Sequence, residues 1–300
     1  MRGSLAIAVA ASLWGLWSLF FKSAERLAVG TTLSARTESF AIMVVMAVVL
    51  LPPALRDRRR AQRRSARSWL GVVCIGACDA LNILCFLTAM QLTTVAIAVL
   101  THYLAPLLVA AAAPVVLGER WRARTAVALV AGLVGLCLLL QPWSATWSSD
   151  GAAHHAQGAA LGALSAVFFA ASVLIQKNLV ARFTSWELGA FPKPASLAVL
   201  ALALPGVGAL AVGTTSWAVL VAGGLLCGAL PCVLFFVGLR TTGASRASVL
   251  TLCEPLVAVL VGALVWREPL GVVGAVGALV ILGAAAAIAR SAPTEPSASL

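Results

Sequence analysis

Residues 249–268 read VLTLCEPLVAVLVGALVWRE, and this stretch decides the fold because its layout occurs twice in the chain. It is apolar nearly throughout, yet Glu254 and Pro255 lie inside it, and it ends in a second glutamate thirteen residues after the proline. Residues 99–119, VLTHYLAPLLVAAAAPVVLGE, repeat this layout, with Pro106 followed by a glutamate at the same spacing. The two copies are offset by 149 residues, half of the 300-residue chain, so the sequence indicates a duplicated unit.

The composition identifies the class of protein. Hydrophobic residues make up 61% of the chain and charged residues 10%, whereas a soluble domain carries about 25% charged residues. The apolar segments can cross a hydrocarbon core of ~30 Å as helices, which bond their own backbone groups in lipid. The sequence therefore predicts an all-α polytopic membrane protein. The net charge of +11 does not indicate nucleic acid as a partner, because the basic residues flank apolar segments, where they set membrane orientation.

Ten transmembrane helices are predicted from the apolar segments. They cover residues 4–22, 34–52, 69–90, 95–117, 124–141, 157–176, 188–212, 217–239, 247–265 and 270–289. Five spans fall in a first repeat, 1–145, and five in a second, 146–290. The polar, proline-containing tail 291–300 is predicted to be disordered and cytoplasmic.

The charges of the loops predict the orientation. With the N-terminus inside, 16 basic residues lie on the inner side and 3 on the outer side, so both termini are expected in the cytoplasm of an inner (plasma) membrane protein. Because each repeat has an odd number of spans, the second repeat enters from the opposite side of the membrane. The duplication is therefore two inverted five-helix repeats, and transporters built in this way bind substrate near the membrane midplane between the repeats.

Several short motifs lie in or next to the predicted spans, and those around the ninth span repeat those around the fourth. They are Trp14-Gly15 and Lys22 in the first span, Ala105-Pro106 and Gly118-Glu119-Arg120 around the fourth, and Glu254-Pro255 and Arg267-Glu268 around the ninth. With these motifs the chain resembles the drug/metabolite transporter superfamily, in its ten-span EamA-type branch, over residues 4–290. The resemblance implies cytoplasmic termini, a central cavity and movement of small metabolites by alternating access, without fixing the substrate. Asp79 and the Thr-His-Tyr triplet at 101–103 depart from the general pattern of that family.

Asp79 lies near the middle of the third predicted span, where a charged residue costs about 2.5–3.5 kcal/mol on insertion scales. Asn82 and Phe86 follow on the same helical face, which is therefore expected to face the interior of the bundle. We interpret Asp79 and Asn82 as substrate- or proton-binding residues. A buried aspartate that only bonds a neighbouring helix is the alternative.

Glu254 is a second acid inside a span, the ninth. Pro255 removes a helical donor and deprives the carbonyl of Thr251 of its usual partner, and Pro106 does the same to the carbonyl of His102. Each proline is predicted to break its helix and to open backbone acceptors at membrane depth, which is tolerated only beside protein or a wet cavity. Glu254 is interpreted as a substrate- or proton-binding carboxylate, and the prolines either as part of that site or as kinks alone.

Other polar and aromatic residues inside the spans are further candidates. His102 and Tyr103 could hydrogen-bond a substrate or carry a proton, although a lone intramembrane histidine is often structural. Two helix-spaced stripes combine aromatic rings with polar groups and could line an amphipathic cavity for organic substrates, or serve ordinary packing. Their members are Trp14, Trp17, Ser18 and Phe21 in the first span, and Ser165, Phe168, Phe169, Ser172 and Gln176 in the sixth.

Charged residues also lie at the ends of predicted spans. Glu119 and Glu268 are expected to cap the helix that follows each of them, or to join the two repeats, rather than to take part in transport. Arg36 and Lys193, near the start of the second and seventh spans, could pair with acids in gates or extend to the membrane interface.

These features predict a secondary active transporter that exports small metabolites, amino acids or drugs and is coupled to protons through Asp79 and Glu254. An uncoupled facilitator of the same fold is the alternative. A scaffold or sensor, or a lipid-modifying enzyme, is the alternative from another class, and no constellation of nucleophile, acid and base supports an enzyme. No cofactor is expected. Asp150, His154 and His155 are three potential metal ligands without a fourth, so no metal is expected. The expected partners are a small-molecule substrate, the lipid bilayer and protons, in a monomer or homodimer.

Overall fold

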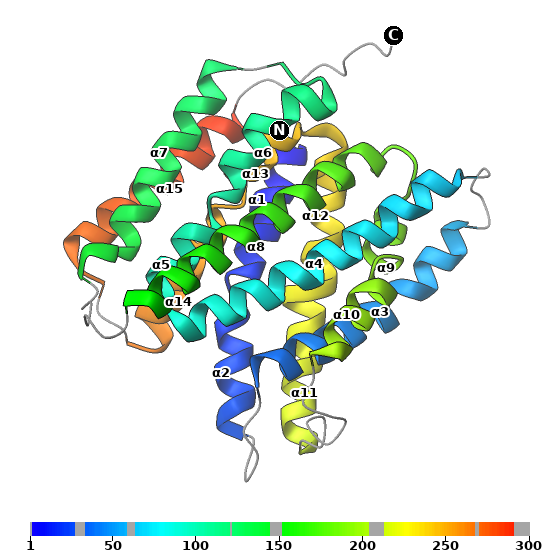
Figure 1. The fold of residues 1–300 in the computed structure, drawn as a ribbon, viewed down its shortest axis with the longest axis horizontal. Coiled ribbons are helices and arrows are strands. Elements are labelled where there is room, and N and C mark those ends of the chain that lie inside the picture. The colour runs from blue at the N-terminus through cyan, green and yellow to red at the C-terminus, as the bar shows by residue number, and fades with distance from the viewer. Residues whose placement is uncertain are drawn as a thin grey trace.

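The computed structural model describes residues 2–27, 34–58, 64–120, 122–144, 152–203, 213–267 and 270–290. Every regular element within these ranges is a helix, so the predicted all-α class is confirmed (Figure 1). The first half contains α1 (Arg2–Trp14), α2 (Trp17–Leu27), α3 (Ala35–Arg58), α4 (Ala66–Leu92), α5 (Val95–His102), α6 (Ala105–Leu117), α7 (Ala123–Leu140) and the short η1 (Pro142–Ser144). The second half contains α8 (Ala152–Leu179), α9 (Ser185–Ala190), α10 (Lys193–Leu202), α11 (Thr214–Gly223), the π-helical η4 (Gly224–Ala229), α12 (Leu230–Thr241), α13 (Ala244–Leu250), α14 (Cys253–Val265) and α15 (Val272–Ala289).

The described residues contain nine helical segments that are long and apolar enough to cross a membrane, and these coincide with nine of the ten predicted spans. The remaining span, predicted at 188–212, is divided between α9 and α10. Pro192 and Pro194 cause this division, because a proline fits the first turn of a helix but not its interior. Residues 204–212 lie outside the described ranges.

The first, fourth and ninth spans are interrupted near their middle, at residues 15–16, 103–104 and 251–252. Pro106 and Pro255 lie in the first turn of the helix that follows each of the last two breaks. At these positions the missing backbone N–H is one that a helix start leaves without an intrahelical partner, so the proline begins a new helix instead of kinking a continuous one.

One prediction about these breaks is wrong, because Pro255 does not leave the carbonyl of Thr251 open. The backbone N–H of Glu254 donates to this oxygen at 3.0 Å. The chain tightens at the break, so the hydrogen bond shifts by one residue toward the N-terminus.

The helices of the two halves correspond, and contacts between helices are repeated when each helix is replaced by its counterpart in the other half. α4 packs along α8, and the corresponding pair, α12 and α1, packs in the same way. Likewise α5 and α6 lie against α8 as α13 and α14 lie against α1, while α7 pairs with its counterpart α15. α1 begins and α15 ends at one end of the bundle, which we call the terminal end (Figure 1). With five spans in each half, this arrangement is the one predicted for an inverted repeat.

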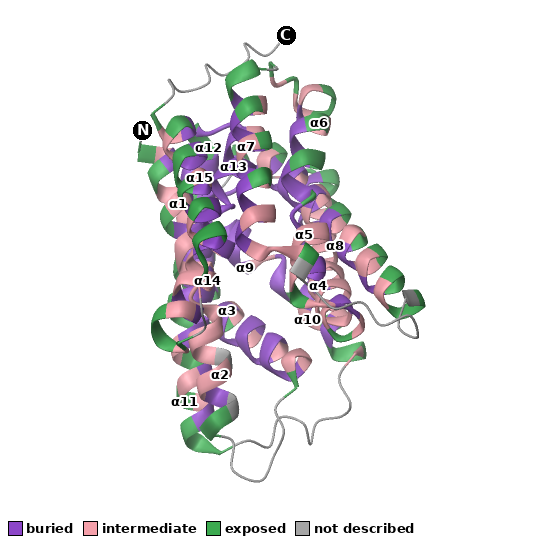
Figure 2. Ribbon diagram, turned by 90° about the vertical axis from the view of Figure 1, so that its left-hand side faces the viewer, coloured by how far each residue is buried: buried purple, intermediate pink, exposed green. Residues whose placement is uncertain are grey.

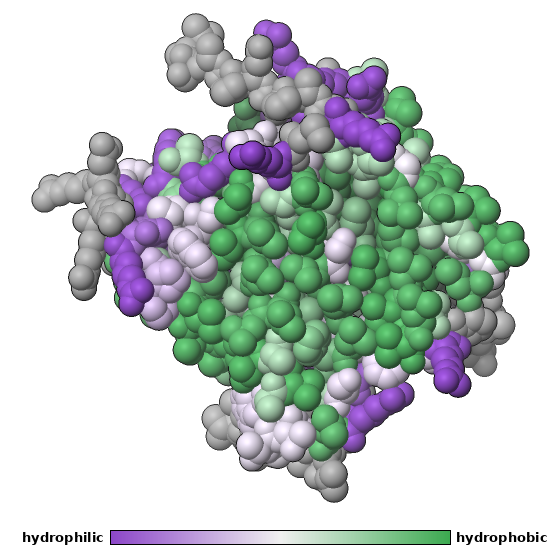
Figure 3. All heavy atoms as spheres, turned by 180° about the vertical axis from the view of Figure 1, so that it is seen from behind, coloured by the Kyte–Doolittle hydropathy of each residue, from purple (hydrophilic) through white to green (hydrophobic). Residues whose placement is uncertain are grey.

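The outer surface of the bundle is suited to lipid. Figure 3 shows a broad hydrophobic face with hydrophilic side chains gathered at its two ends. Large aliphatic side chains are exposed, among them Leu5, Val115, Leu202 and Val272. The buried residues lie between the helices, toward the interior of the bundle (Figure 2). An apolar area of this extent would drive association in water, whereas a bilayer covers it.

A buried ion pair joins the two halves at the terminal end. Arg64, just before α4, donates through both terminal nitrogens to the carboxylate of Glu187 on α9, at 2.7 and 2.6 Å. Its Nε donates to the carbonyl of Arg182 at 2.9 Å, and its guanidinium lies 4.1 Å from the ring centroid of Phe183. The side chain of Glu187 has no exposed surface and that of Arg64 is 10% exposed. The α3–α4 connection is therefore bound to the second half.

Candidate substrate-binding site

The carboxylate of Asp79 faces the second half of the chain rather than lipid. Ser172 of α8 donates its hydroxyl to the carboxylate oxygen Oδ1 at 2.5 Å, and Gln176, one turn further along, donates to the Ser172 hydroxyl at 2.8 Å. Ser172 and Gln176 are buried, and α4 and α8 pack along each other over much of their length. The structure thus brings together Asp79 and two members of the polar stripe predicted on the sixth span.

A buried cation lies near the same carboxylate. Lys193, the first residue of α10, is 4% exposed and interacts electrostatically with Asp79, but the two groups have no N–O distance within 4.0 Å and form no direct ion pair. Asn82, one turn after Asp79 on α4, has a buried side-chain oxygen without a hydrogen-bond partner among the described residues. Buried groups of this kind are stable only when a ligand, water or counter-charge supplies the missing bonds.

Glu254 lies at the seam between the halves, where two broken spans meet. Its carboxylate is hydrogen-bonded to the hydroxyl of Tyr103, which lies in the break between α5 and α6 and is 6% exposed. Glu254 itself is the second residue of α14, the second helix of the other broken span. The two acids therefore share one arrangement, because each is held by a hydroxyl from the opposite half.

Gly15 brings the break of the first span to the same place. A Cβ atom at this position would lie 2.5 Å from the carbonyl oxygen of Glu254 and 2.7 Å from the Cβ of Val257. Both distances are far below van der Waals contact, so the α1–α2 break can approach the backbone of α14 only with a glycine at this position. The Trp14-Gly15 motif is explained by this contact.

His102 is enclosed by rings. Its Nδ1 lies 2.9 Å from the hydroxyl of Ser165, which itself donates to the carbonyl of Gly162 at 2.7 Å, so the histidine nitrogen is assigned as the donor. Phe86 and Phe169 contact the imidazole with centroid distances of 4.8 and 5.5 Å. His102 thus forms an aromatic wall beside the face of α4 that carries Asp79, and one of its nitrogens is used for packing.

The stripe predicted on the first span is divided by the break at 15–16. Trp14 ends α1 and contacts Phe235 of α12 with a centroid distance of 5.4 Å. Trp17 begins α2 and packs against the hydrophobic core. The hydroxyl of Ser18 is buried and has no partner within the described part of the chain. The side chain of Phe21 lies outside the described atoms.

The acid at the end of the first repeat joins the two halves. Glu119 accepts from the backbone N–H groups of Ala244 at 2.5 Å and Ser245 at 3.2 Å, at the start of α13. Lys177 donates to the carbonyls of Leu239 and Thr242, at 2.7 and 2.8 Å, where α12 ends. Glu119 therefore caps a helix of the other half rather than the helix that follows it, and so joins the two repeats, which is the second of the two roles expected for it. Glu268 lies outside the described residues.

The burial of Lys193 is a feature of the site that the sequence did not predict. The burial of Lys193 contradicts the expectation that it extends to the membrane interface, whereas its pairing with an acid in a gate stays a prediction. The sequence Pro192-Lys193-Pro194 within an apolar segment indicates a helix that begins at a charged residue inside the bundle, because two prolines favour a helix start at this place. Of the loop residues weighed as metal ligands, Asp150 lies outside the described ranges and His155 is within 3.1 Å of the Thr93 hydroxyl.

The fold and the polar seam define a polytopic α-helical membrane protein of two related halves. The chain belongs to the EamA-like transporter family, whose model matches residues 1–141 and 156–290. An uncharacterized transporter of Archaeoglobus fulgidus is 30% identical to it over 280 residues, which are 93% of each protein. A crystal structure with 20% sequence identity covers 96% of both chains at a TM-score of 0.78, which shows a shared fold alone. The protein is therefore a membrane transporter of the drug/metabolite transporter superfamily, and its family is one of transporters rather than enzymes, as the sequence predicted.

Proposed function

We propose that this transporter is a secondary active exporter that moves small metabolites, amino acids or drugs across the inner membrane by alternating access. The observation that carries the proposal is the seam between the repeats, where Asp79 bonds Ser172 and Glu254 bonds Tyr103. In both pairs the acid and the hydroxyl belong to opposite repeats. Alternating access moves one repeat against the other, so these bonds are released when the seam opens and the acids become available to substrate.

The charges at the seam support a substrate with an anionic and a cationic group. Lys193 provides an ammonium and Asp79 a carboxylate, and the two are not joined directly. The side-chain oxygen of Asn82 adds an acceptor. Phe86 and Phe169 add apolar surface next to these groups. A small zwitterion with an apolar side group, as in an amino acid, matches this combination of groups.

Proton coupling is proposed for the same two acids. A carboxylate that is removed from water needs a proton, a counter-ion or a ligand. If Asp79 binds the cationic group of the substrate in one state and a proton in the other, each molecule exported is exchanged for a proton. Glu254, held by Tyr103 in the same manner, is the second group that can take part in this exchange.

Proteoliposomes that enclose a pH-sensitive dye test the coupling. Addition of transported amino acids should drive proton movement in the wild type, and Asp79→Asn should abolish that movement while the protein remains folded. Asp57→Asn, which changes an acid near the end of α3, is the matched control and should behave as the wild type. If Asp79→Asn leaves proton movement unchanged, Asp79 is not the coupling residue. Transport without any proton movement would identify a facilitator. Chemical change of the solute would identify an enzyme, and a protein that neither transports nor changes the solute would be a scaffold.

Three probes with one hydrocarbon group test the substrate class. Leucine carries both charges, 3-methylbutan-1-amine only the cation and 4-methylpentanoate only the anion, and each is tested as a competitor of a transported amino acid. The zwitterion should compete best in the wild type. Lys193→Gln should remove the preference for leucine over 3-methylbutan-1-amine. Asp79→Asn should remove the preference for leucine over 4-methylpentanoate. Unchanged preferences in both variants would contradict the assignment.

We further propose that both termini are cytoplasmic and that the repeats are 1–145 and 146–290, followed by the tail 291–300. The excess of basic residues in the segments on the side of the termini supports this orientation.

A further inference from the structure

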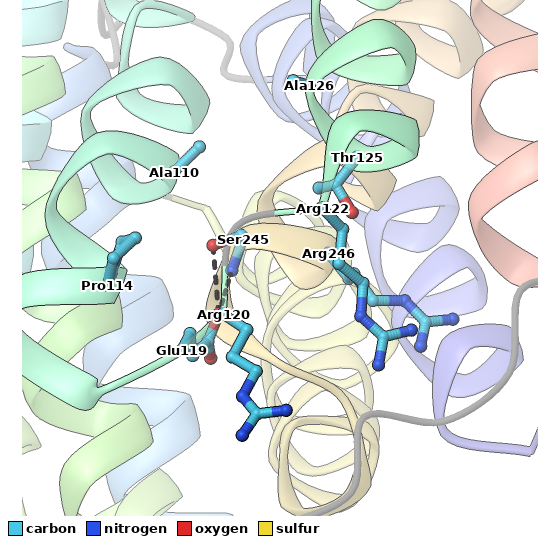
Figure 4. A pocket seen from close by; sticks show the side chains of 9 residues that line it. All are labelled: Ala110, Pro114, Glu119, Arg120, Arg122, Thr125, Ala126, Ser245 and Arg246. Atoms are coloured by element: carbon cyan, nitrogen blue, oxygen red, sulfur yellow. Dashed lines mark hydrogen bonds between the residues drawn. The ribbon is translucent and has the colours of Figure 1, made fainter. Parts of the chain in front are cut away.

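A pocket lies at the terminal end of the bundle, on the outside of the site described above. It opens between α6 and α7, with the start of α13 behind it (Figure 4). Its lining consists of Ala110, Pro114, Glu119, Arg120, Arg122, Thr125, Ala126, Ser245 and Arg246. α6 and α7 touch each other little, whereas α13 packs on both, so α13 forms the floor of a groove with a helix on each side.

The pocket has an excess of positive charge. Three arginines line it against one carboxylate, Glu119. That carboxylate is occupied by the backbone of α13 and by the hydroxyl of Ser245, which donates to it at 3.0 Å. Arg122 and Arg246 interact electrostatically as like charges, and Figure 4 shows their guanidinium groups next to each other. An anion between them would convert this repulsion into attraction.

The position of Arg246 is fixed by the fold. Its side chain is 4% exposed, and one terminal nitrogen donates to the carbonyl of Ile288 near the end of α15 at 2.8 Å. Arg120 and Arg122 lie in the exposed connection between α6 and α7. The pocket thus combines one rigid cation with two that can adjust to a ligand, and a guanidinium can donate two parallel hydrogen bonds to a phosphate.

Exposed aliphatic side chains lie near the pocket on the outer surface of the same two helices. On α6, Val115 and Val116 are 88% and 54% exposed, and on α7, Val127 and Val130 are 69% and 58% exposed. Val115 and Val116 lie in the last turn of α6, and Val127 and Val130 lie four and seven residues after the start of α7, so these side chains are close along each helix to the connection that carries Arg120 and Arg122. A ligand with a phosphate and hydrocarbon chains would meet both parts at once.

We propose that this pocket binds the phosphate headgroup of an anionic phospholipid, with the acyl chains along the exposed valines of α6 and α7. Basic pockets between transmembrane helices are the form that recognition of anionic headgroups takes in membrane proteins. The pocket includes Glu119 from the first half and Arg246 from the second, so a bound lipid stabilises the contact between the halves at this end. This site is separate from the seam and does not depend on the substrate.

Full-length protein in lipid nanodiscs tests the proposal. Discs of phosphatidylcholine alone are compared with discs that contain a minor share of phosphatidylglycerol, and native mass spectrometry measures which lipid the released protein retains. The wild type should retain phosphatidylglycerol above its share in the disc and unfold at a higher temperature in its presence. Arg120→Gln and Arg122→Gln should each lower this retention about fivefold, the factor that corresponds to roughly 1 kcal/mol per arginine near an anionic surface.

Arg124→Gln is the matched control, because Arg124 is exposed in the first turn of α7, next to that connection, but does not line the pocket. It should retain the lipid as the wild type does. Retention of phosphatidylglycerol by the wild type only in proportion to its share in the disc, or the same loss in all three variants, would overturn the proposal. A third arm adds inorganic phosphate to phosphatidylcholine discs. If free phosphate raises the unfolding temperature as much as phosphatidylglycerol does, the pocket is a site for a soluble anion and the lipid assignment is wrong.

Discussion

Replacement of Arg64 by Met removes the cation that joins the halves at the terminal end. The carboxylate of Glu187 then loses two hydrogen bonds, of 2.7 and 2.6 Å, and keeps the bond from the backbone N–H of Thr184 at 2.8 Å. Removal of one partner from a buried ion pair costs about 3–5 kcal/mol, whereas an exposed pair contributes about 0.2–1 kcal/mol. The side chains are 10% and 0% exposed, so the pair belongs to the buried class. We expect Arg64→Met to lower the free energy of unfolding by about 3 kcal/mol.

Unfolding in mixed micelles with increasing dodecyl sulfate, followed by the fluorescence of the 9 tryptophans, measures this change. Glu187→Gln and the double variant complete a thermodynamic cycle. The double variant should be more stable than the sum of the single losses predicts, with a coupling above about 1 kcal/mol. Arg56→Met, an exposed arginine near the end of α3, is the control and should change stability by less than about 0.5 kcal/mol. A loss below about 1 kcal/mol for Arg64→Met, or the absence of coupling, would refute the reasoning.

Three further predictions follow from other contacts. Gly15→Ala places a Cβ atom against the backbone of α14 and should destabilise the protein by about 1–3 kcal/mol, whereas Gly283→Ala, where a Cβ meets nothing within 4 Å, should have no such effect in the same unfolding assay. Ser172→Ala removes the hydrogen bond to the carboxylate on α4 and should weaken apparent substrate affinity in proteoliposomes; an unchanged affinity would separate that bond from binding. For the proposed orientation, a membrane-impermeant maleimide should label Arg26→Cys in intact cells and Arg290→Cys only after permeabilisation, and the reverse pattern would contradict it.

The sequence predicted the parts of the fold that depend on composition and repetition. Apolar length identified the spans, because backbone groups in lipid must be bonded within a helix. The proline and glutamate spacing identified the duplication. The breaks before Pro106 and Pro255 were predicted from the missing N–H of proline, and the helices α6 and α14 begin close to these residues.

The parts that were not predicted depend on contacts between distant segments. The break at 15–16 contains no proline, and the close approach of Gly15 to the carbonyl of Glu254 at this break joins residues that are far apart in the sequence. The partner of Glu119 is the start of α13, 125 residues further along the chain, and nothing near Glu119 in the sequence indicates it. The burial of Lys193 likewise depends on how α10 packs against α3 and α4. The local sequence pattern predicts the helices, whereas the polar contacts between the two halves depend on how the whole bundle is assembled.

The accessibility of Ser172 tests the central claim that the seam between the repeats is the route of the substrate. In a protein whose 7 native cysteines have been replaced, Ser172→Cys is compared with Val167→Cys, which lies on the same helix but is 50% exposed on the surface of the bundle. A charged, water-soluble thiol reagent should modify Ser172→Cys in membranes, more slowly when a transported solute is present, and should leave Val167→Cys unmodified. Modification of Val167→Cys alone, or of Ser172→Cys at a rate that no transported solute changes, would contradict the account.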